Sequence, residues 1–152
     1  MNVDLYLGLL RSGEQVLAQS FRQTAEGHGD EPDVYELCHT LAKQCDEHER
    51  RLEPIIDRYG ERPDGEPDRF HAEAMSESRS GPVGLLRDLQ DLFVLVSLVH
   101  STWTITRQAA LALRDEELLA LIDDCDGQTE VQHAWLSTRM KQAAPQALLV
   151  AS

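Results

Sequence analysis

The chain is poor in aromatic side chains. Phe, Trp and Tyr make up 5% of its 152 residues, while hydrophobic residues as a whole make up 41%. A core of this composition is built mainly from Leu, Val, Ile and Ala, which favours packed helices over an all-β sandwich. The length allows one domain with a sizeable core, and we expect no second domain.

Basic residues are scarce relative to acidic ones. The 14 Lys and Arg residues face 27 Asp and Glu residues, so the formal net charge is −13. A field of that sign repels phosphate backbones and anionic lipid surfaces, which argues against nucleic acid and membranes as partners. Cations remain as plausible ligands.

Long apolar runs and a signal peptide are also lacking. The longest run, from Leu92 to Val99 and interrupted by Ser97, is far too short to span a membrane. The first four residues, Met-Asn-Val-Asp, do not begin a secretory signal. We therefore expect a cytoplasmic protein whose three cysteines are reduced thiols. These cysteines are Cys38, Cys45 and Cys125.

Apolar residues recur at spacings of three and four along four stretches of the chain. The positions expected to face inward are 3, 7, 10, 14, 17 and 21 on the first, 34, 37, 41, 45, 48, 52, 55 and 59 on the second, 89, 93, 96, 100 and 103 on the third, and 122, 126, 129, 133, 136 and 140 on the fourth. We expect helices over about residues 3–26, 32–59, 82–113 and 118–143, with residues 114–117 as a tight corner before the last. Pro54 predicts a kink or an early end in the second helix, and Gly127 weakens the case for an unbroken fourth helix. The domain is expected to cover residues 1–145, with residues 146–152 as a C-terminal tail.

The lengths of the connections predict the topology. Short links join the first helix to the second and the third to the fourth, so each pair forms an antiparallel hairpin. The connection over residues 60–81 reaches roughly 70 Å at ~3.3 Å per residue, whereas a helix of 26 residues is about 39 Å long. We therefore expect an all-α, ferritin-like four-helix bundle, in which a long crossover joins two antiparallel hairpins. An up-down-up-down bundle with a loose loop is the alternative.

Six polar side chains interrupt the apolar stripes near the middle of the expected helices. Antiparallel helices of similar length bring their midpoints to one level, so these side chains are predicted to share a polar layer inside the bundle. Glu130 lies at the border of its stripe and the others are expected to point inward. The six residues are Glu14, Cys45, His48, His100, Glu130 and His133.

A buried carboxylate needs a partner, and the sequence offers two kinds. One is a metal ion, because imidazole and thiolate suit zinc or iron, and carboxylates suit iron or manganese. The other is a protonated His48 or His100 paired with Glu14 in a hydrogen-bond network that fixes helix register. A wetter interior, in which some of these groups reach solvent, is a third interpretation. Iron, zinc and no metal at all therefore stay open.

Short stretches resemble the ferritin-like bacterial proteins of the domain-of-unknown-function 892 class. They are Leu9 to Leu17, His48 to Glu53, Glu73-Ala74-Met75 and the long third helix around His100. The resemblance covers most of the chain in layout, and it implies a ferritin-like bundle and a link to stress conditions.

The resemblance also implies a metal site with an altered ligand set. Ferritin-like sites use a Glu from one helix of each hairpin, and a Glu and a His one turn apart from the other. Glu14, His48, Glu130 and His133 match these positions, whereas Cys45 and His100 stand where Glu is expected. With the usual four carboxylates reduced to about two, we expect a degenerate di-iron site that holds one metal ion or none, which argues against oxidase or storage chemistry.

Two functions follow from these patterns. The first is a metal-binding protein, and the second is a non-catalytic bundle that acts as a homodimer or with another protein. The apolar side chains that we expect to be exposed, and that would suit the second function, are Leu5, Leu92, Leu98 and Trp135. Three other histidines, His28, His39 and His71, are expected to be solvated, and Trp103 to pack in the core.

Overall fold

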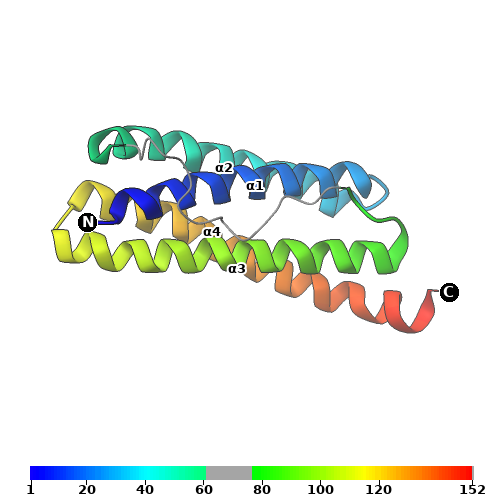
Figure 1. Ribbon diagram of the computed structural model, residues 1–152. Coiled ribbons are helices and arrows are strands. Elements are labelled where there is room, and N and C mark those ends of the chain that lie inside the picture. Colours follow the sequence, from blue (N-terminus) through cyan, green and yellow to red (C-terminus); the bar gives the residue numbers. More distant parts are fainter. Residues whose placement is uncertain (61–76, 152) are drawn as a thin grey trace.

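The computed structural model describes residues 1–60 and 77–151. Within these residues the chain is all-helical, without a strand (Figure 1). The elements are α1 (Val3–Gly27), α2 (Pro32–Tyr59), α3 (Gly81–Leu113), α4 (Glu116–Pro145) and the π-helical turn η1 (Gln146–Val150). The predicted all-α class and its four helices are confirmed. No helix of the described residues has both the length and the apolar character needed to cross a membrane.

Local sequence explains where the helices begin and end. Pro32 opens α2, where its missing N–H has no helical partner in any case. Gly60 follows α2 with a φ of 89°, which glycine adopts without strain. Arg114 ends α3 in the left-handed region, at a φ of 53°. Asp115 then caps α4, since its Oδ1 atom accepts the Leu118 N–H at 3.0 Å.

The helices continue through the residues that the sequence marked as breaks. Helix α2 runs through Pro54 to Tyr59 and does not end early. Helix α4 runs unbroken through Gly127. After Pro145, where we expected a tail to begin, the chain continues as η1, and Ala147 of that turn is buried. Burial of an apolar face outweighs the weak intrinsic helix preference at these positions. The expected turn at Glu73-Ala74-Met75 and His71 lie outside the described residues.

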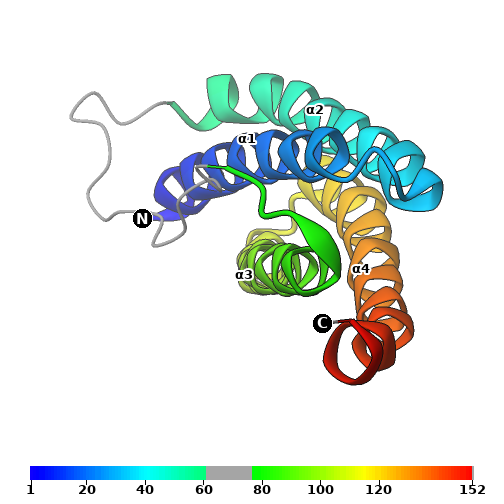
Figure 2. The same ribbon diagram turned by 90° about the vertical axis from the view of Figure 1, so that its right-hand side faces the viewer.

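The helices pack as a bundle in which α1 lies against α2 and α3, and α4 lies against α3 and α2 (Figure 2). Along each of these contacts, residue numbers rise on one helix as they fall on the other. Between α1 and α2 the contacts are Arg11–Glu53, Gln15–Glu49 and Arg22–Asp46. Between α1 and α3 they are Glu14–Trp103 and, from the residue that caps the end of α1, His28–Asp88. Helix α4 contacts α3 through His100–Asp126 and Arg107–Asp123, and α2 through Arg51–Asp124 and Arg139–Asp33.

The core confirms the predicted stripes of α1 and α2 better than that of α3. On α1 every predicted inward residue is buried, including Leu7, Leu10 and Phe21. On α3, Leu92 is fully buried, so our prediction that it is exposed is wrong. The reason is that α3 is apolar on most of its sides, and periodicity then does not identify the buried face. Trp103 is fully buried, as predicted.

A second buried polar cluster lies at the end of α1, away from the predicted layer. The fully buried carboxylate of Asp88 accepts the backbone N–H of Arg79 at 2.9 Å and its guanidinium at 2.8 Å. Its Oδ2 atom also lies 2.7 Å from Nε2 of His28. His28 is 3% exposed, so the prediction that it is solvated is wrong. It follows α1 directly and turns inward beneath the segment that leads into α3.

The same segment approaches α1 closely at Gly27. A Cβ atom added at Gly27 would lie 2.2 Å from Cβ of Ser78, which is shorter than any real contact. The Ser78 hydroxyl donates to the carbonyl oxygen of Gln23 on α1. Gly27 is thus needed for packing and not only as a helix end.

Candidate functional site

The six side chains singled out from the sequence fall into two groups. Glu14, Cys45 and His48 are buried in the core, where they are at most 1% exposed. His100 and His133 are partly exposed and Glu130 is exposed. The structure therefore brings three of the residues together inside the bundle and places the other three at the α3–α4 edge.

The inner group is a hydrogen-bond network to which all four helices contribute. Oε1 of Glu14 lies 3.1 Å from Nδ1 of His48 and accepts the indole N–H of Trp103, also at 3.1 Å. The other ring nitrogen of His48, Nε2, lies 2.7 Å from Oε1 of Gln128. The sequence offered His48 or His100 as the histidine that pairs with Glu14, and in the structure this partner is His48.

His48 has the surroundings of a charged imidazolium. Both ring nitrogens face oxygen atoms, and only the protonated ring donates from both. Burial alone lowers the pKa of His48, but the hydrogen bond and charge of Glu14, with the bond to Gln128, raise it above its ordinary value. Glu14 and His48 thus form a buried ion pair.

Cys45 lies beside this pair as a neutral thiol. Burial raises the pKa of Cys45 well above its ordinary value, and the charge of Glu14 raises it further. Nε2 of Gln132 lies 3.8 Å from the sulfur. A thiol held in this state is a poor nucleophile and a poor metal ligand. Oε2 of Glu14 is buried without a hydrogen bond. One unpartnered oxygen, a neutral thiol and an imidazole with both nitrogens engaged do not make a metal-binding set.

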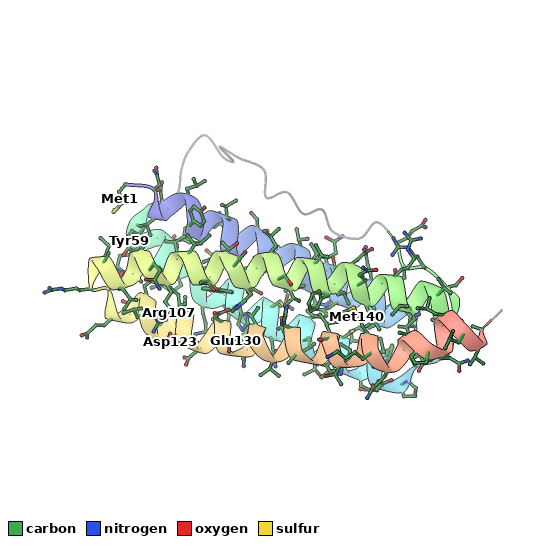
Figure 3. The ribbon with its side chains drawn as sticks, turned by 90° about the horizontal axis from the view of Figure 1, so that it is seen from below. Met1, Tyr59, Arg107, Asp123, Glu130 and Met140 are labelled. Carbon is green, nitrogen blue, oxygen red and sulfur yellow. The ribbon has the colours of Figure 1, made fainter. Side chains whose placement is uncertain are left out.

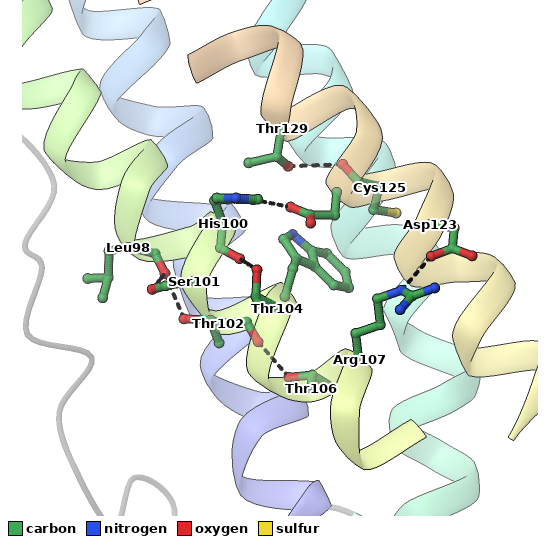
Figure 4. A network of polar contacts seen from close by, with 12 residues as sticks. Leu98, His100, Ser101, Thr102, Thr104, Thr106, Arg107, Asp123, Cys125 and Thr129 are labelled. Atoms are coloured by element: carbon green, nitrogen blue, oxygen red, sulfur yellow. Dashed lines mark hydrogen bonds and ion pairs between the residues drawn. The ribbon is translucent and has the colours of Figure 1, made fainter. Parts of the chain in front are cut away.

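At the α3–α4 edge, Asp126 joins His100 and Glu130, and we call these three residues the outer group. The outer group has the composition of a metal site. His100, Asp126 and Glu130 each offer one ligand atom, and these three atoms lie within 4.8 Å of one another. Nδ1 of His100 is 2.7 Å from Oδ1 of Asp126, across the α3–α4 contact. Figure 4 marks this contact by the dashed line that starts at the His100 ring. Asp126 and Glu130 are four residues apart on α4, so they face the same way. Figure 3 shows Glu130 about midway along that helix.

The electrostatics of the outer group favour a bound cation. Burial raises the pKa of Asp126, and the negative charges of Glu130 and Glu14 raise it further, while His100 opposes the shift. Two carboxylates so close together repel each other when both are ionised. A divalent cation between them would relieve that repulsion.

His133 lies next to the outer group without joining it. Its ring centroid is 6.4 Å from that of His100 and 4.4 Å from that of Phe93. It is three residues after Glu130 on α4, so the two side chains share a face.

Asp126, Gln128 and Gln132 were not predicted as site residues. The signal for Asp126 was available, because it falls on the predicted inner stripe of α4 and precedes Glu130 by one turn. Gln128 lies at an exposed position of α4, and a glutamine at such a position gives no sign in the sequence that it belongs to a site. The three cysteines are free and buried, as expected for reduced thiols.

Comparison of the chain with protein-family models, with curated proteins and with solved structures gives no match. We therefore infer a function from the geometry of the two polar groups.

Proposed function

We propose that the chain binds one divalent transition metal ion at the α3–α4 edge, held by His100, Asp126 and Glu130. The observation that carries this proposal is the convergence of one imidazole and two carboxylates within 4.8 Å. A nitrogen ligand with two oxygen ligands suits zinc, iron or manganese better than calcium or magnesium, which prefer oxygen ligands alone. Iron and zinc are the ions to test first.

We further propose that the bundle has the ferritin-like arrangement, with two antiparallel hairpins and a long crossover. The opposite order of the contacts along every pair of neighbouring helices supports it. By that order α2 and α3 run the same way, so the end of α2 at Tyr59 and the start of α3 at Gly81 lie at opposite ends of the bundle. The proposed ion at the α3–α4 edge then lies beside the position that the di-iron centre takes in ferritin-like proteins.

The proposed role is to hold one ion, without turnover. Paired ions need bridging carboxylates to offset their charge, and the outer group supplies two carboxylates in total. The inner position is occupied by the Glu14–His48 ion pair. Three free cysteines also suit the reducing conditions of the cytoplasm, where we place the protein.

The test is a calorimetric titration of the protein with Zn²⁺, Mn²⁺ and, without oxygen, Fe²⁺. Asp126→Asn removes one ligand charge and leaves the side-chain shape nearly unchanged. Asp124→Asn is the matched control, since it removes the same charge two residues away on the exposed side of α4. We expect one ion per chain in the wild type and the control, and an affinity at least about ten-fold lower in Asp126→Asn. Equal affinities in all three proteins would refute the site.

A further inference from the structure

Two further rings lie next to the outer group at the α3–α4 edge. The ring centroid of His133 is 4.4 Å from that of Phe93 and 6.4 Å from that of His100. Phe93 and His100 are seven residues apart on α3, which corresponds to a rise of about 10.5 Å along the helix. The two ring distances together are close to that rise, so the His133 ring lies between the other two. We call Phe93, His133 and His100 the ring row.

The ring row extends from the proposed metal ligands along the edge of the bundle. His100 belongs both to the row and to the outer group. His133 follows Glu130 on α4 by three residues, and helical side chains point back towards the N-terminus, which brings the His133 ring towards Glu130. Phe93 and His133 are both partly exposed. An ion held by the outer group therefore has ring surface beside it that solvent can reach.

The outer group supplies fewer ligands than the ion takes. A zinc ion with three protein ligands keeps its fourth position for water or another molecule. Iron bound by three side chains likewise keeps open positions. Glu130 is exposed and the His100 side chain is 35% exposed, so a molecule can reach these positions from solvent.

The charges at this edge favour a neutral molecule. The two carboxylates of the outer group already offset the charge of one divalent ion. No Lys or Arg occurs among residues 92–106 of α3 or residues 116–138 of α4. Arg51 of α2, which reaches α4 beside them, is bound to Asp124. An anionic molecule would therefore add charge to a chain of net charge −13, without a cationic side chain on α3 or α4 to pair with it.

We propose that the ion at the outer group binds a small, neutral aromatic heterocycle through an unprotonated ring nitrogen, with the ring of that molecule packed against His133. This inference rests on the proposed metal site and adds the class of molecule that the ion takes. An uncharged ring nitrogen is a good ligand for zinc and iron. Aromatic rings attract each other at centroid separations of about 4.5–7 Å, which is the scale of the ring row. One planar molecule thus fills the open position and contacts the ring row.

The first experiment compares two heterocycles that share the donor nitrogen and differ in ring area. Zinc-loaded wild type would be titrated in a calorimeter with imidazole and with benzimidazole, at a pH above the pKa of both. Their affinities for free zinc ions in the same buffer provide the reference. Relative to that reference, the contact of the larger ring with His133 should favour benzimidazole about three- to ten-fold. Metal-free protein should bind neither molecule.

Substitutions of His133 assign this preference to the ring row. His133→Ala removes the ring, so it should abolish the preference for benzimidazole and leave the zinc affinity unchanged. His133→Phe keeps a ring and removes both nitrogen atoms, so it should keep the preference. Val131→Ala is the control, because Val131 is a residue of α4 that is 66% exposed and lies outside the ring row. It should behave as the wild type does.

The outcomes separate this inference from the metal site. If zinc does not bind the wild type, both are overturned. If zinc binds but the loaded protein binds neither heterocycle, or shows no preference for benzimidazole, this inference alone is overturned. These results come from the wild type, so they decide the matter even if a variant does not fold.

Two further results would also overturn the inference. A preference for benzimidazole that persists in His133→Ala would show that the ring row does not contact the bound molecule. Benzoate has an aromatic ring and a carboxylate, so it tests the anionic alternative. If zinc-loaded wild type bound benzoate more tightly than benzimidazole, the ligand class would be an aromatic anion and not a neutral heterocycle.

Discussion

Nδ1 of His48 lies 3.1 Å from Oε1 of Glu14, and the two side chains are 1% and 0% exposed. Breaking such a pair is costly because the remaining charge is buried alone. Trp103 and Gln128 extend the pair to α3 and α4, so it relates all four helices to one another. We infer that it fixes the register of the bundle, and that its effect is on folding rather than on ligand binding.

A double-mutant cycle measures this coupling. Glu14→Leu or His48→Leu alone should lower the free energy of unfolding by about 3–5 kcal/mol, since each leaves one buried partner without the other. The double variant should be less destabilised than the sum of the two, because no unpaired charge remains. Urea unfolding of the four proteins gives the coupling energy. Simple additivity would show that the two groups do not act as a pair.

The pair also predicts a pH dependence of stability. The pKa of His48 is raised in the folded protein, so the folded state binds the proton more tightly than the unfolded state does. The stabilisation is complete below the unfolded-state pKa of about 6.5 and is lost as pH rises through the higher folded-state pKa. The difference in unfolding free energy between the wild type and His48→Gln should therefore shrink from pH 6.5 upward. A difference that is constant or grows with pH contradicts a protonated His48.

The Asp88 cluster predicts a large difference between two neighbouring carboxylates. Asp88 is fully buried and accepts two hydrogen bonds from Arg79, whereas the Asp91 side chain is 46% exposed. Asp88→Asn should cost about 2–4 kcal/mol of unfolding free energy, and Asp91→Asn less than about 1 kcal/mol. Denaturant unfolding of both variants provides the comparison. Equal losses would mean that the cluster does not hold Ser78 and Arg79 against α1 and α3.

The close approach at Gly27 gives a further prediction. Gly27→Ala places a Cβ atom 2.2 Å from Cβ of Ser78, so the segment before α3 must shift, at a cost of about 1–3 kcal/mol. Gly29→Ala is the matched control, since nothing lies within 4 Å of its added Cβ atom. Thermal unfolding should show a lower midpoint for Gly27→Ala alone. If the unfolding midpoint of Gly29→Ala fell equally, the loss would come from the turn after α1 and not from the contact between residue 27 and Ser78.

Helical periodicity predicted the elements of the fold well because it depends on burial along each helix separately. The stripe containing Leu7, Leu10 and Glu14 is buried as predicted, and the polar interruption at Glu14 did mark a buried network. On α3 the same reasoning misplaced Leu92, because an apolar helix does not reveal which side faces its neighbours.

The candidate site was harder to predict because it depends on the rotation of α3 and α4 about their axes. His100 was expected inward, and its side chain is instead 35% exposed and bonded to Asp126. A rotation of one residue position moves a side chain by 100° around a helix, which is enough to exchange core for edge. His28 was misjudged for a related reason, because a loop position in the sequence gave no sign of the buried Asp88 that binds it.

Metal content measured by plasma mass spectrometry tests the central claim most directly. The wild type, Asp126→Asn and His48→Gln would be purified side by side from cells supplied with iron, zinc and manganese, with circular dichroism to confirm folding. Our account predicts about one ion per chain in the wild type and in His48→Gln, and less than roughly a tenth of that in Asp126→Asn. Metal that is absent from the wild type, or lost in His48→Gln and kept in Asp126→Asn, would contradict a site at His100, Asp126 and Glu130.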